Sequence, residues 1–143
     1  MLLSRHVVRI EWGDCDAAGI VFYPRYFQFF DAATTRLIEL AGYSHRELQR
    51  RFDIVGWPIV DARATFFAPA TYGDDIAIET KIVAFRRSSF DVTHRAFNLS
   101  REDAPAMIEA HETRVWTGRD PDDATRLKSR PIPEEVKERL SGG

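Results

Sequence analysis

Residues 13–26 of this chain, GDCDAAGIVFYPRY, decide its fold and carry its most informative chemistry. They place a carboxylate, Asp16, in a loop that runs directly into a long apolar segment. Pro24 fits the first position of a helix, because its ring presets φ and its missing N–H would be unpaired there. A helix start presents free backbone N–H groups and a partial positive charge. The stretch therefore predicts a carboxylate beside backbone donors that can polarise an activated carbonyl.

Residues 24–41 are predicted to form this long helix. Apolar side chains recur there at spacings of three and four and make one stripe, formed by Tyr26, Phe30, Ala33, Leu37 and Leu40. Gly42 follows the stripe and is typical of a helix stop. A shorter helix is predicted over residues 44–52, with Ser44 as its cap and Glu47 three residues later.

Most of the remaining chain has the period of strands. Apolar and polar residues alternate in five segments, which are residues 6–12, 58–66, 76–85, 89–97 and 106–117. In the second segment, Val60, Ala62, Ala64 and Phe66 are expected to share the face that a helix covers. Short connections favour antiparallel pairing. The pattern predicts an α+β fold with one long helix on one face of a five-stranded antiparallel sheet, and a short helix over residues 133–140.

Length, charge and cysteine content restrict the class of protein. A chain of 143 residues is expected to form one domain, residues 1–143. Its 20 basic and 22 acidic residues give a net charge of −2, which argues against a nucleic-acid partner. The single cysteine allows no intrachain disulfide and fits a reducing compartment. No segment approaches the roughly 20 apolar residues of a membrane span. A soluble cytoplasmic protein without a membrane partner is expected.

A second copy of the chain is the expected protein partner. One sheet covered by one helix leaves a sheet edge and part of an apolar surface open. Pairing with another copy would protect both, so the fold predicts a homo-oligomer.

The chain resembles the hot-dog-fold thioesterases, and most closely their 4-hydroxybenzoyl-CoA thioesterase branch. The resemblance covers nearly the whole chain, and its most specific part is the loop Gly13-Asp14-Cys15-Asp16 with Gly19-Ile20-Val21 and Tyr23-Pro24. Weaker matches follow at Asp31-Ala32-Ala33, Ile54-Val55-Gly56, Pro58-Ile59-Val60, Tyr72, Asp74-Asp75, Ile78-Glu79-Thr80, Arg86-Arg87, Ser89-Phe90 and residues 112–115.

The resemblance implies a hot-dog fold, in which the sheet wraps round the long helix. It also implies dimers that pair into tetramers, with active sites at the dimer interface. Asp16 would be the catalytic carboxylate, and the backbone N–H of Tyr23 would hold the thioester oxygen. Arg86 and Arg87 would lie near the phosphates of coenzyme A, and Asp31 would lie near the acyl pocket.

The residues by themselves leave alternatives open. Asp16 could simply accept hydrogen bonds from loop N–H groups, as Asp often does. Arg86 and Arg87 could be a solvated turn between two strands. According to the resemblance, Trp57 stands where the hydroxybenzoyl enzymes have a small hydroxyl residue, so it either reshapes the acyl or pantetheine channel or packs in the core. His94 shares a face with apolar residues and is expected to be a hydrogen-bonded core histidine.

The predicted function is hydrolysis of an aryl or medium-chain acyl-CoA to the acid and free coenzyme A, without a metal or redox cofactor. Asp16 would act as a nucleophile or as a general base on water. A hot-dog dehydratase is less favoured, because its chemistry requires an Asp/His pair and no such histidine accompanies Asp16. A third possibility is a non-catalytic acyl-CoA-binding or interaction subunit.

Overall fold

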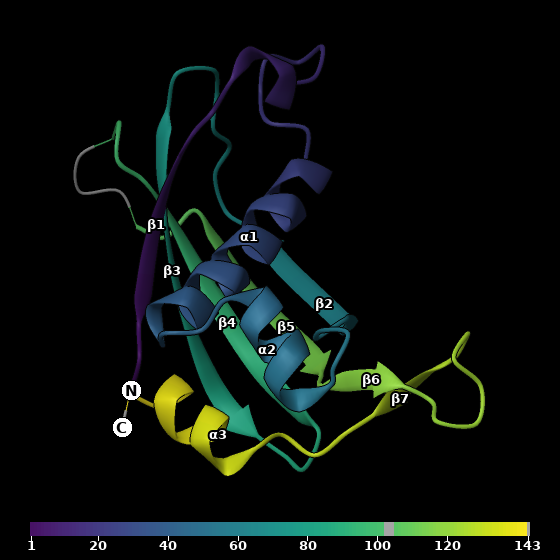
Figure 1. Cartoon of the computed structure of the whole chain (residues 1–143). Coiled ribbons are helices and arrows are strands. Elements are labelled where there is room, and N and C mark those ends of the chain that lie inside the picture. The colour runs from purple at the N-terminus through teal and green to yellow at the C-terminus, as the bar shows by residue number, and fades with distance from the viewer. Residues whose placement is uncertain (102–104, 143) are drawn as a thin grey trace.

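A five-stranded antiparallel sheet curves around one long helix, as the sequence predicts (Figure 1). The structure is a computed structural model that describes residues 1–101 and 105–142. The sheet has the order β1-β3-β4-β5-β2. Its strands are β1 (Ser4–Arg9), β2 (Ile59–Phe66), β3 (Asp75–Phe85), β4 (Ser89–Asn98) and β5 (Ile108–Val115). The long helix, α1 (Pro24–Leu40), lies across one face of this sheet.

The helices begin and end where local signals place them. Pro24 occupies the start of α1, and Gly42 lies just beyond its end with φ of +99°, a conformation that favours glycine. In α2 (His45–Phe52), the Ser44 hydroxyl accepts a hydrogen bond of 3.1 Å from the Glu47 N–H, which confirms the predicted cap. The last helix is α3 (Glu134–Leu140). Within the described ranges, no helix is long and apolar enough to cross a membrane.

Two predicted strands are too long. The first ends at Arg9 rather than at Trp12, and a short 3₁₀ turn, η1 (Trp12–Asp14), leads into the Asp16 loop. The last breaks at Trp116, whose side chain is buried in the core. Beyond Trp116 the chain forms a separate hairpin of β6 (Thr117–Arg119) and β7 (Leu127–Ser129). Alternation alone does not reveal such breaks, because it continues through both of them.

Strand β2 lies at an edge of the sheet and is less buried than its pattern predicts. Ala64 packs against the core, and the ring of Phe66 lies 5.7 Å from that of Tyr26 on α1. Val60, however, is 63% exposed. The register with β5 shifts between Ile59 and Asp61, so a bulge takes Val60 out of the alternation.

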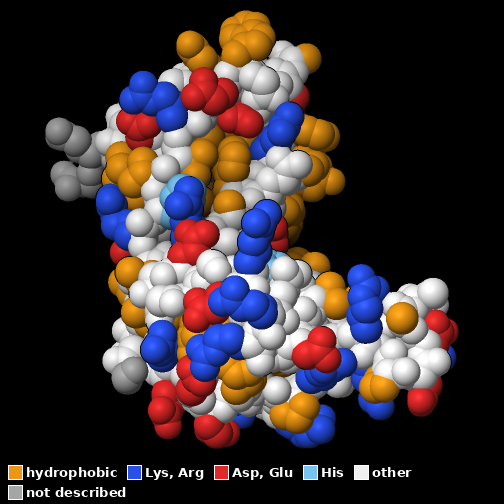
Figure 2. All heavy atoms as spheres, viewed as in Figure 1, with side chains coloured by type: hydrophobic (Ala, Val, Ile, Leu, Met, Phe, Trp, Pro, Cys, Tyr) orange, Lys and Arg blue, Asp and Glu red, His pale blue; other side chains and the backbone are white. Residues whose placement is uncertain are grey.

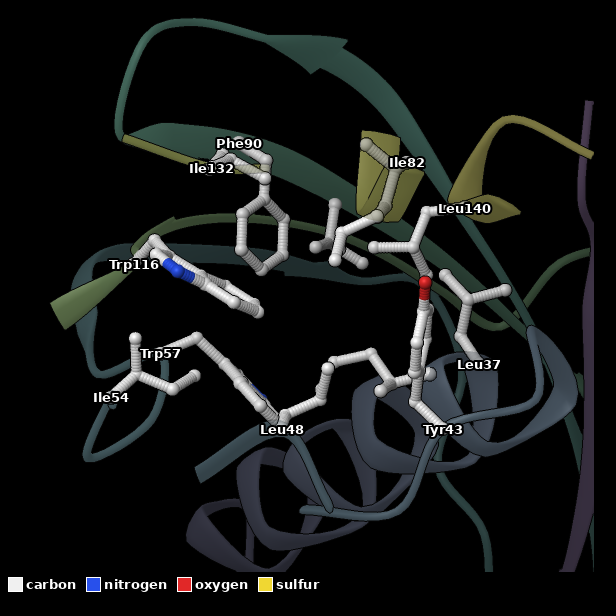
Figure 3. Packing of buried hydrophobic residues seen from close by; sticks show 13 residues of the cluster. Leu37, Tyr43, Leu48, Ile54, Trp57, Ile82, Phe90, Trp116, Ile132 and Leu140 are labelled. Atoms are coloured by element: carbon white, nitrogen blue, oxygen red, sulfur yellow. The ribbon is translucent and has the colours of Figure 1, made fainter. Parts of the chain in front are cut away.

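The core consists of two hydrophobic clusters at the two ends of α1. One surrounds the first half of the helix and contains Tyr26, Phe30 and Ala33. The other surrounds its second half and the smaller helices, and Figure 3 shows its residues, among them Leu37, Trp57 and Trp116. Each cluster joins α1 to the inner face of the sheet.

A polar layer separates the two clusters. Thr34 of α1, Thr80 of β3, His94 of β4 and Glu112 of β5 are all buried there, and His94 confirms the predicted hydrogen-bonded core histidine. Burial alone would raise the pKa of Glu112. Hydrogen bonds from His94 and Arg114, together with the neighbouring positive charge, outweigh this and hold the pKa at about 2.

The buried Glu112 carboxylate should make the protein sensitive to acid. Because its folded pKa of about 2 lies below the ordinary 4.5, the folded chain binds fewer protons here than the unfolded chain. Its contribution to stability is complete above pH 4.5 and is lost as the pH falls toward 2. Glu112→Gln is expected to lower the free energy of unfolding at neutral pH and to flatten its decline in acid. Urea unfolding over a pH series measures both.

The control for this experiment is Glu39→Gln, which neutralises an exposed carboxylate on α1. Glu39→Gln is expected to leave the pH dependence as it is in the wild type. Equal slopes for the wild type and Glu112→Gln would contradict the assignment.

Candidate active site

A tight turn holds Asp16 at the surface. The Asp16 N–H donates to the Ile20 carbonyl at 3.0 Å, and the Gly19 N–H donates back to the Asp16 carbonyl at 2.9 Å. Gly19 has φ of +80°, which favours glycine at this position. The Ala18 N–H donates to Asp16 Oδ1 at 2.9 Å. The carboxylate is thus oriented through one oxygen, while its side chain remains exposed to solvent.

The same loop is fastened to the start of α1. The Phe22 N–H donates to the Asp14 carbonyl at 2.8 Å, and the Arg25 guanidinium donates to the Gly13 carbonyl at 3.3 Å. The Asp14 carboxylate accepts from the Glu11 N–H at 2.8 Å, so its role is structural. These contacts bring the Asp16 turn and the first residues of α1 to one end of the molecule (Figure 1).

Tyr23 presents a free backbone N–H at the helix start. Its neighbours are paired: Phe22 donates to Asp14, Arg25 to Phe22, and Tyr26 to Tyr23 itself. Pro24 has no N–H to offer. Among the described residues, no hydrogen bond from the Tyr23 N–H is found. A donor left open at the positive end of a helix is suited to stabilise a developing negative charge.

Two hollows lie in this region, one lined by Asp16 and the other by Tyr23. One, of about 260 Å³, is lined by Trp12, Cys15, Asp16, Gly19, Thr71 and Tyr72. The other, of about 380 Å³, is apolar and is lined by Ile20, Val21, Tyr23, Tyr26 and residues 66–69. Hydrophobic side chains gather on the surface beside the start of α1 (Figure 2). No histidine lines the Asp16 hollow, so the structure offers no Asp/His pair there.

Asp31 lies two helical turns beyond Tyr23 on α1. Its side chain is 67% exposed, and its Oδ1 accepts from the Arg114 guanidinium at 2.9 Å. Arg114, a residue of β5, is itself buried and donates to the Trp57 carbonyl at 3.3 Å. Asp31 is therefore an exposed carboxylate that is held in place by the buried guanidinium of Arg114.

Arg86 and Arg87 differ in their side-chain contacts. Both Arg86 and Arg87 are exposed in the β3–β4 turn. The Arg86 guanidinium binds both oxygens of Asp91, at 2.6 and 3.0 Å, and the Ser89 hydroxyl at 2.8 Å. This fork holds the pKa of Asp91 at about 2. For the Arg87 side chain, no ion pair or hydrogen bond is found in the described part of the chain, so its donors face solvent.

Within one chain, Arg86 and Arg87 lie far from Asp16. Thr71, which precedes β3, bridges to Ile20 in the Asp16 loop, whereas Arg86 follows the last residue of β3. Strand β3 has 11 residues. At about 3.3 Å per residue, its two ends lie roughly 30 Å apart.

The comparisons with known proteins identify the family. The sequence matches the thioesterase-like superfamily over residues 10–140. The chain belongs to this superfamily. It is 36% identical to the 4-hydroxybenzoyl-CoA thioesterase of Pseudomonas sp. strain CBS-3 over 135 residues, which are 93% of this chain and 94% of the relative. It is 29% identical to the acyl-CoA thioester hydrolase YbgC of Escherichia coli O6:H1 over 134 residues, 94% of this chain and 92% of the relative.

Solved structures agree with this assignment. The structure of 4-hydroxybenzoyl-CoA thioesterase from the same Pseudomonas strain superposes with a TM-score of 0.89 at 35% identity, covering 97% of this chain and 99% of that one. A mutant of 4-hydroxybenzoyl-CoA thioesterase complexed with 4-hydroxybenzoyl-CoA gives 0.90 at 34% identity, covering 98% and 99%. The expected hot-dog fold is confirmed. The protein is a thioester hydrolase, which removes the non-catalytic subunit from consideration.

Sequence reasoning missed Arg114 in this thioesterase-superfamily member. On β5, Ile108, Ala110, Glu112 and Arg114 alternate and share the inner face of the sheet. Two charged residues on a face that is otherwise apolar are the signal that would have revealed a buried ion pair. No group of three or more His, Cys, Asp or Glu side chains in the described ranges is arranged to hold a metal ion.

Trp57 lies in the core of the single chain. Its ring stacks on His45 at 4.4 Å and lies parallel to that of Trp116 at 6.1 Å, and it is 6% exposed. Figure 3 shows it pointing toward Leu48 and Trp116 in the cluster at the second half of α1. This position favours the core role that the sequence left open.

The burial of Trp57 predicts a large loss of stability on truncation. Trp57→Thr removes most of a buried ring and is expected to cost about 3–5 kcal/mol of unfolding free energy. Trp12→Thr is the matched control, because Trp12 is 81% exposed and should change stability by less than about 0.5 kcal/mol. Urea unfolding compares the two. A changed acyl preference with unchanged stability would instead assign Trp57 to the acyl channel.

Proposed function

We propose that this protein hydrolyses an aryl or medium-chain acyl-CoA to the free acid and coenzyme A, at the site formed by Asp16 and the Tyr23 N–H. The observation that carries the proposal is the unpaired Tyr23 donor at the start of α1, fastened to the loop that presents Asp16. The named relatives, a 4-hydroxybenzoyl-CoA thioesterase and an acyl-CoA thioester hydrolase, support the substrate class.

The chemistry has two requirements. The thioester carbonyl carbon needs an attacking oxygen, and the carbonyl oxygen needs a donor as negative charge develops on it. The Tyr23 N–H meets the second requirement, and losing a donor of this kind costs about 2.7–4 kcal/mol in other enzymes. Asp16 meets the first, with one oxygen oriented by the Ala18 N–H and the other open to solvent.

Asp16 acts in one of two ways. As a nucleophile, its oxygen bonds to the carbonyl carbon and expels the coenzyme A thiolate, and water then cleaves the resulting anhydride. As a general base, it takes a proton from the water that attacks the carbonyl directly. Label found in the Asp16 carboxylate after a single turnover in ¹⁸O-labelled water would establish the anhydride route, because general-base catalysis places the label only in the acid product.

The coenzyme A end of the substrate is assigned to Arg87. Its guanidinium faces solvent, and the planar fork of arginine matches phosphate oxygens. Arg86 uses three of its five N–H donors on Asp91 and Ser89, so we assign it to holding the β3–β4 turn.

A homodimer would unite the two ends of the site. Strand β2 and the residue that follows it expose apolar side chains, namely Ile59, Val60, Phe66 and Phe67. If two β2 edges pair antiparallel about a twofold axis, each chain's β3–β4 turn comes beside the partner's Asp16 end. This arrangement accounts for a roughly 30 Å separation within one chain that a single substrate has to bridge. The pairing of dimers into tetramers stays a prediction.

Asp16→Ala is expected to lower kcat by about 10³-fold or more, because the attacking group is lost. Thiol release from a panel of aryl- and alkyl-CoA thioesters, followed with a thiol-trapping dye, measures this and ranks the substrates. Asp14→Asn is the matched control, and its kcat should stay within a few-fold of the wild type because its carboxylate only orders the loop. Unchanged kcat in Asp16→Ala would refute the mechanism.

Arg87→Ala is expected to raise KM for acyl-CoA about tenfold, because a charge-assisted contact to phosphate is lost. Arg86→Ala is expected to raise KM less, since its donors already bind Asp91. The same assays with a truncated pantetheine thioester, which has no nucleotide phosphates, should show equal KM values for Arg87→Ala and the wild type.

Mixing the Asp16→Ala and Arg87→Ala proteins tests whether Arg87 of one chain completes the Asp16 site of a second chain in a homodimer. Exchange of subunits would rebuild one intact site in each hybrid dimer, so about one quarter of the low-KM activity should return. No recovery after demonstrated subunit exchange would place Asp16 and Arg87 in separate sites.

A further inference from the structure

The contact between α1 and the sheet contains one continuous polar chain. Glu112 Oε1 lies 2.8 Å from His94 Nε2, and His94 Nδ1 lies 2.8 Å from the Thr80 hydroxyl. Glu112 Oε2 accepts from the Thr34 hydroxyl at 3.3 Å and from Arg114 Nε at 2.8 Å. Thr34 is the member of this chain that belongs to α1, and it is fully buried.

This contact determines where α1 sits along its own axis. The hydrophobic clusters on either side hold the helix against the sheet, but apolar attraction is non-directional and tolerates sliding. The Thr34 hydroxyl donates to Glu112 and also lies 3.5 Å from His94 Nε2, and a slide of one turn would move it by about 5.4 Å and break both contacts. A buried polar group that loses its partner is costly, so only one axial position satisfies the contact.

A second tie reinforces the first. Arg114, which donates to Glu112, also reaches Asp31, one turn before Thr34 on the same helix. Two residues of α1 are therefore connected to the Glu112 carboxylate, one directly and one through Arg114. Asp31 and Thr34 both precede Leu37 on α1, and both contact side chains of β5.

The start of α1 follows the position of this contact. Tyr23 lies 11 residues before Thr34, about 16 Å along a continuous hydrogen-bonded helix. The Asp16 turn is fastened to the start of α1, but it is also held by the segment that precedes β3, because the Thr71 hydroxyl donates to the Gly19 carbonyl at 2.7 Å. An axial shift of α1 would therefore move the Tyr23 N–H relative to the Asp16 turn.

We propose that Glu112 is a positioning residue for catalysis, which acts through Thr34 to hold α1 so that the Tyr23 N–H meets the thioester oxygen. The catalytic part of this inference rests on the proposed function. Glu112 itself touches no substrate. Its effect reaches the reaction through the axial position of the helix, where small displacements of a donor weaken transition-state stabilisation strongly.

Thr34 offers the cleanest test. Replacing Glu112 would take away the acceptor of Arg114 Nε and the partner of His94 Nε2, and the loss of stability would obscure the effect on kcat. Thr34→Val keeps the shape of the side chain and removes only the hydroxyl, whereas Thr34→Ser keeps the hydroxyl. Ile38→Val is the control, because it shortens a buried residue of α1 that belongs to the hydrophobic cluster around the second half of the helix and not to the polar chain.

Two readouts are needed for each variant. The first is kcat and KM with the best acyl-CoA of the panel, at a temperature where every variant is folded. Thr34→Val is expected to lower kcat about tenfold with little change in KM, while Thr34→Ser and Ile38→Val stay within about twofold of the wild type. The second is the backbone amide resonance of Tyr23 by NMR, which should shift in Thr34→Val and not in the other two.

The outcomes separate this inference from the proposed function. A Tyr23 shift confined to Thr34→Val supports the positioning role even if the wild type releases no thiol, a result that would refute the proposed function alone. If Thr34→Val changes neither kcat nor the Tyr23 resonance, the inference is overturned. It is also overturned if Ile38→Val lowers kcat as much as Thr34→Val does, since any weakening of α1 packing would then suffice.

Discussion

The buried carboxylate of Glu112 is the constraint on which the assembly of this protein depends. An ionised group in the interior is stable only with close partners, and those of Glu112 come from three elements: Thr34 from α1, His94 from β4 and Arg114 from β5. Arg114 extends the network to the Trp57 carbonyl and to Asp31. Removing one partner of such a buried pair typically costs about 3–5 kcal/mol. The hydrophobic clusters drive the packing of α1, and the polar layer selects one arrangement of it.

The arrangement divides the chemistry between the two ends of the sheet. The end near the start of α1 carries the Asp16 turn and the free Tyr23 donor, which we propose as the attacking group and the oxyanion donor. The β3–β4 turn at the other end carries Arg87, with its donors open to solvent. A chain with these two ends and an exposed apolar β2 edge is suited to pair with a copy of itself. Such a dimer would cover the exposed β2 edge and would also bring the two ends of the proposed site together.

Local signals in the sequence were reliable where the structure depends on neighbours in the chain. The start of α1 at Pro24, its apolar stripe as far as Leu37 and the Ser44 cap were predictable, because they involve residues three or four positions apart. Leu40, the last residue of the predicted stripe, is 55% exposed because it lies at the end of the helix. The signals failed where long-range packing interrupts a pattern. Burial of Trp116 ends β5, and a bulge exposes Val60, although the alternation of residues continues through both.

The sequence by itself determined the Asp16 loop, the long helix that follows it, the strand segments and, through the resemblance, the family. Each depends on short spacings or on a contiguous motif. Only the tertiary structure decided which arginine is free, where Trp57 lies and what holds Asp31. Thr34 and Glu112 meet across 78 residues of chain. Such a contact has no local signature, because it exists only after the helix has packed on the folded sheet.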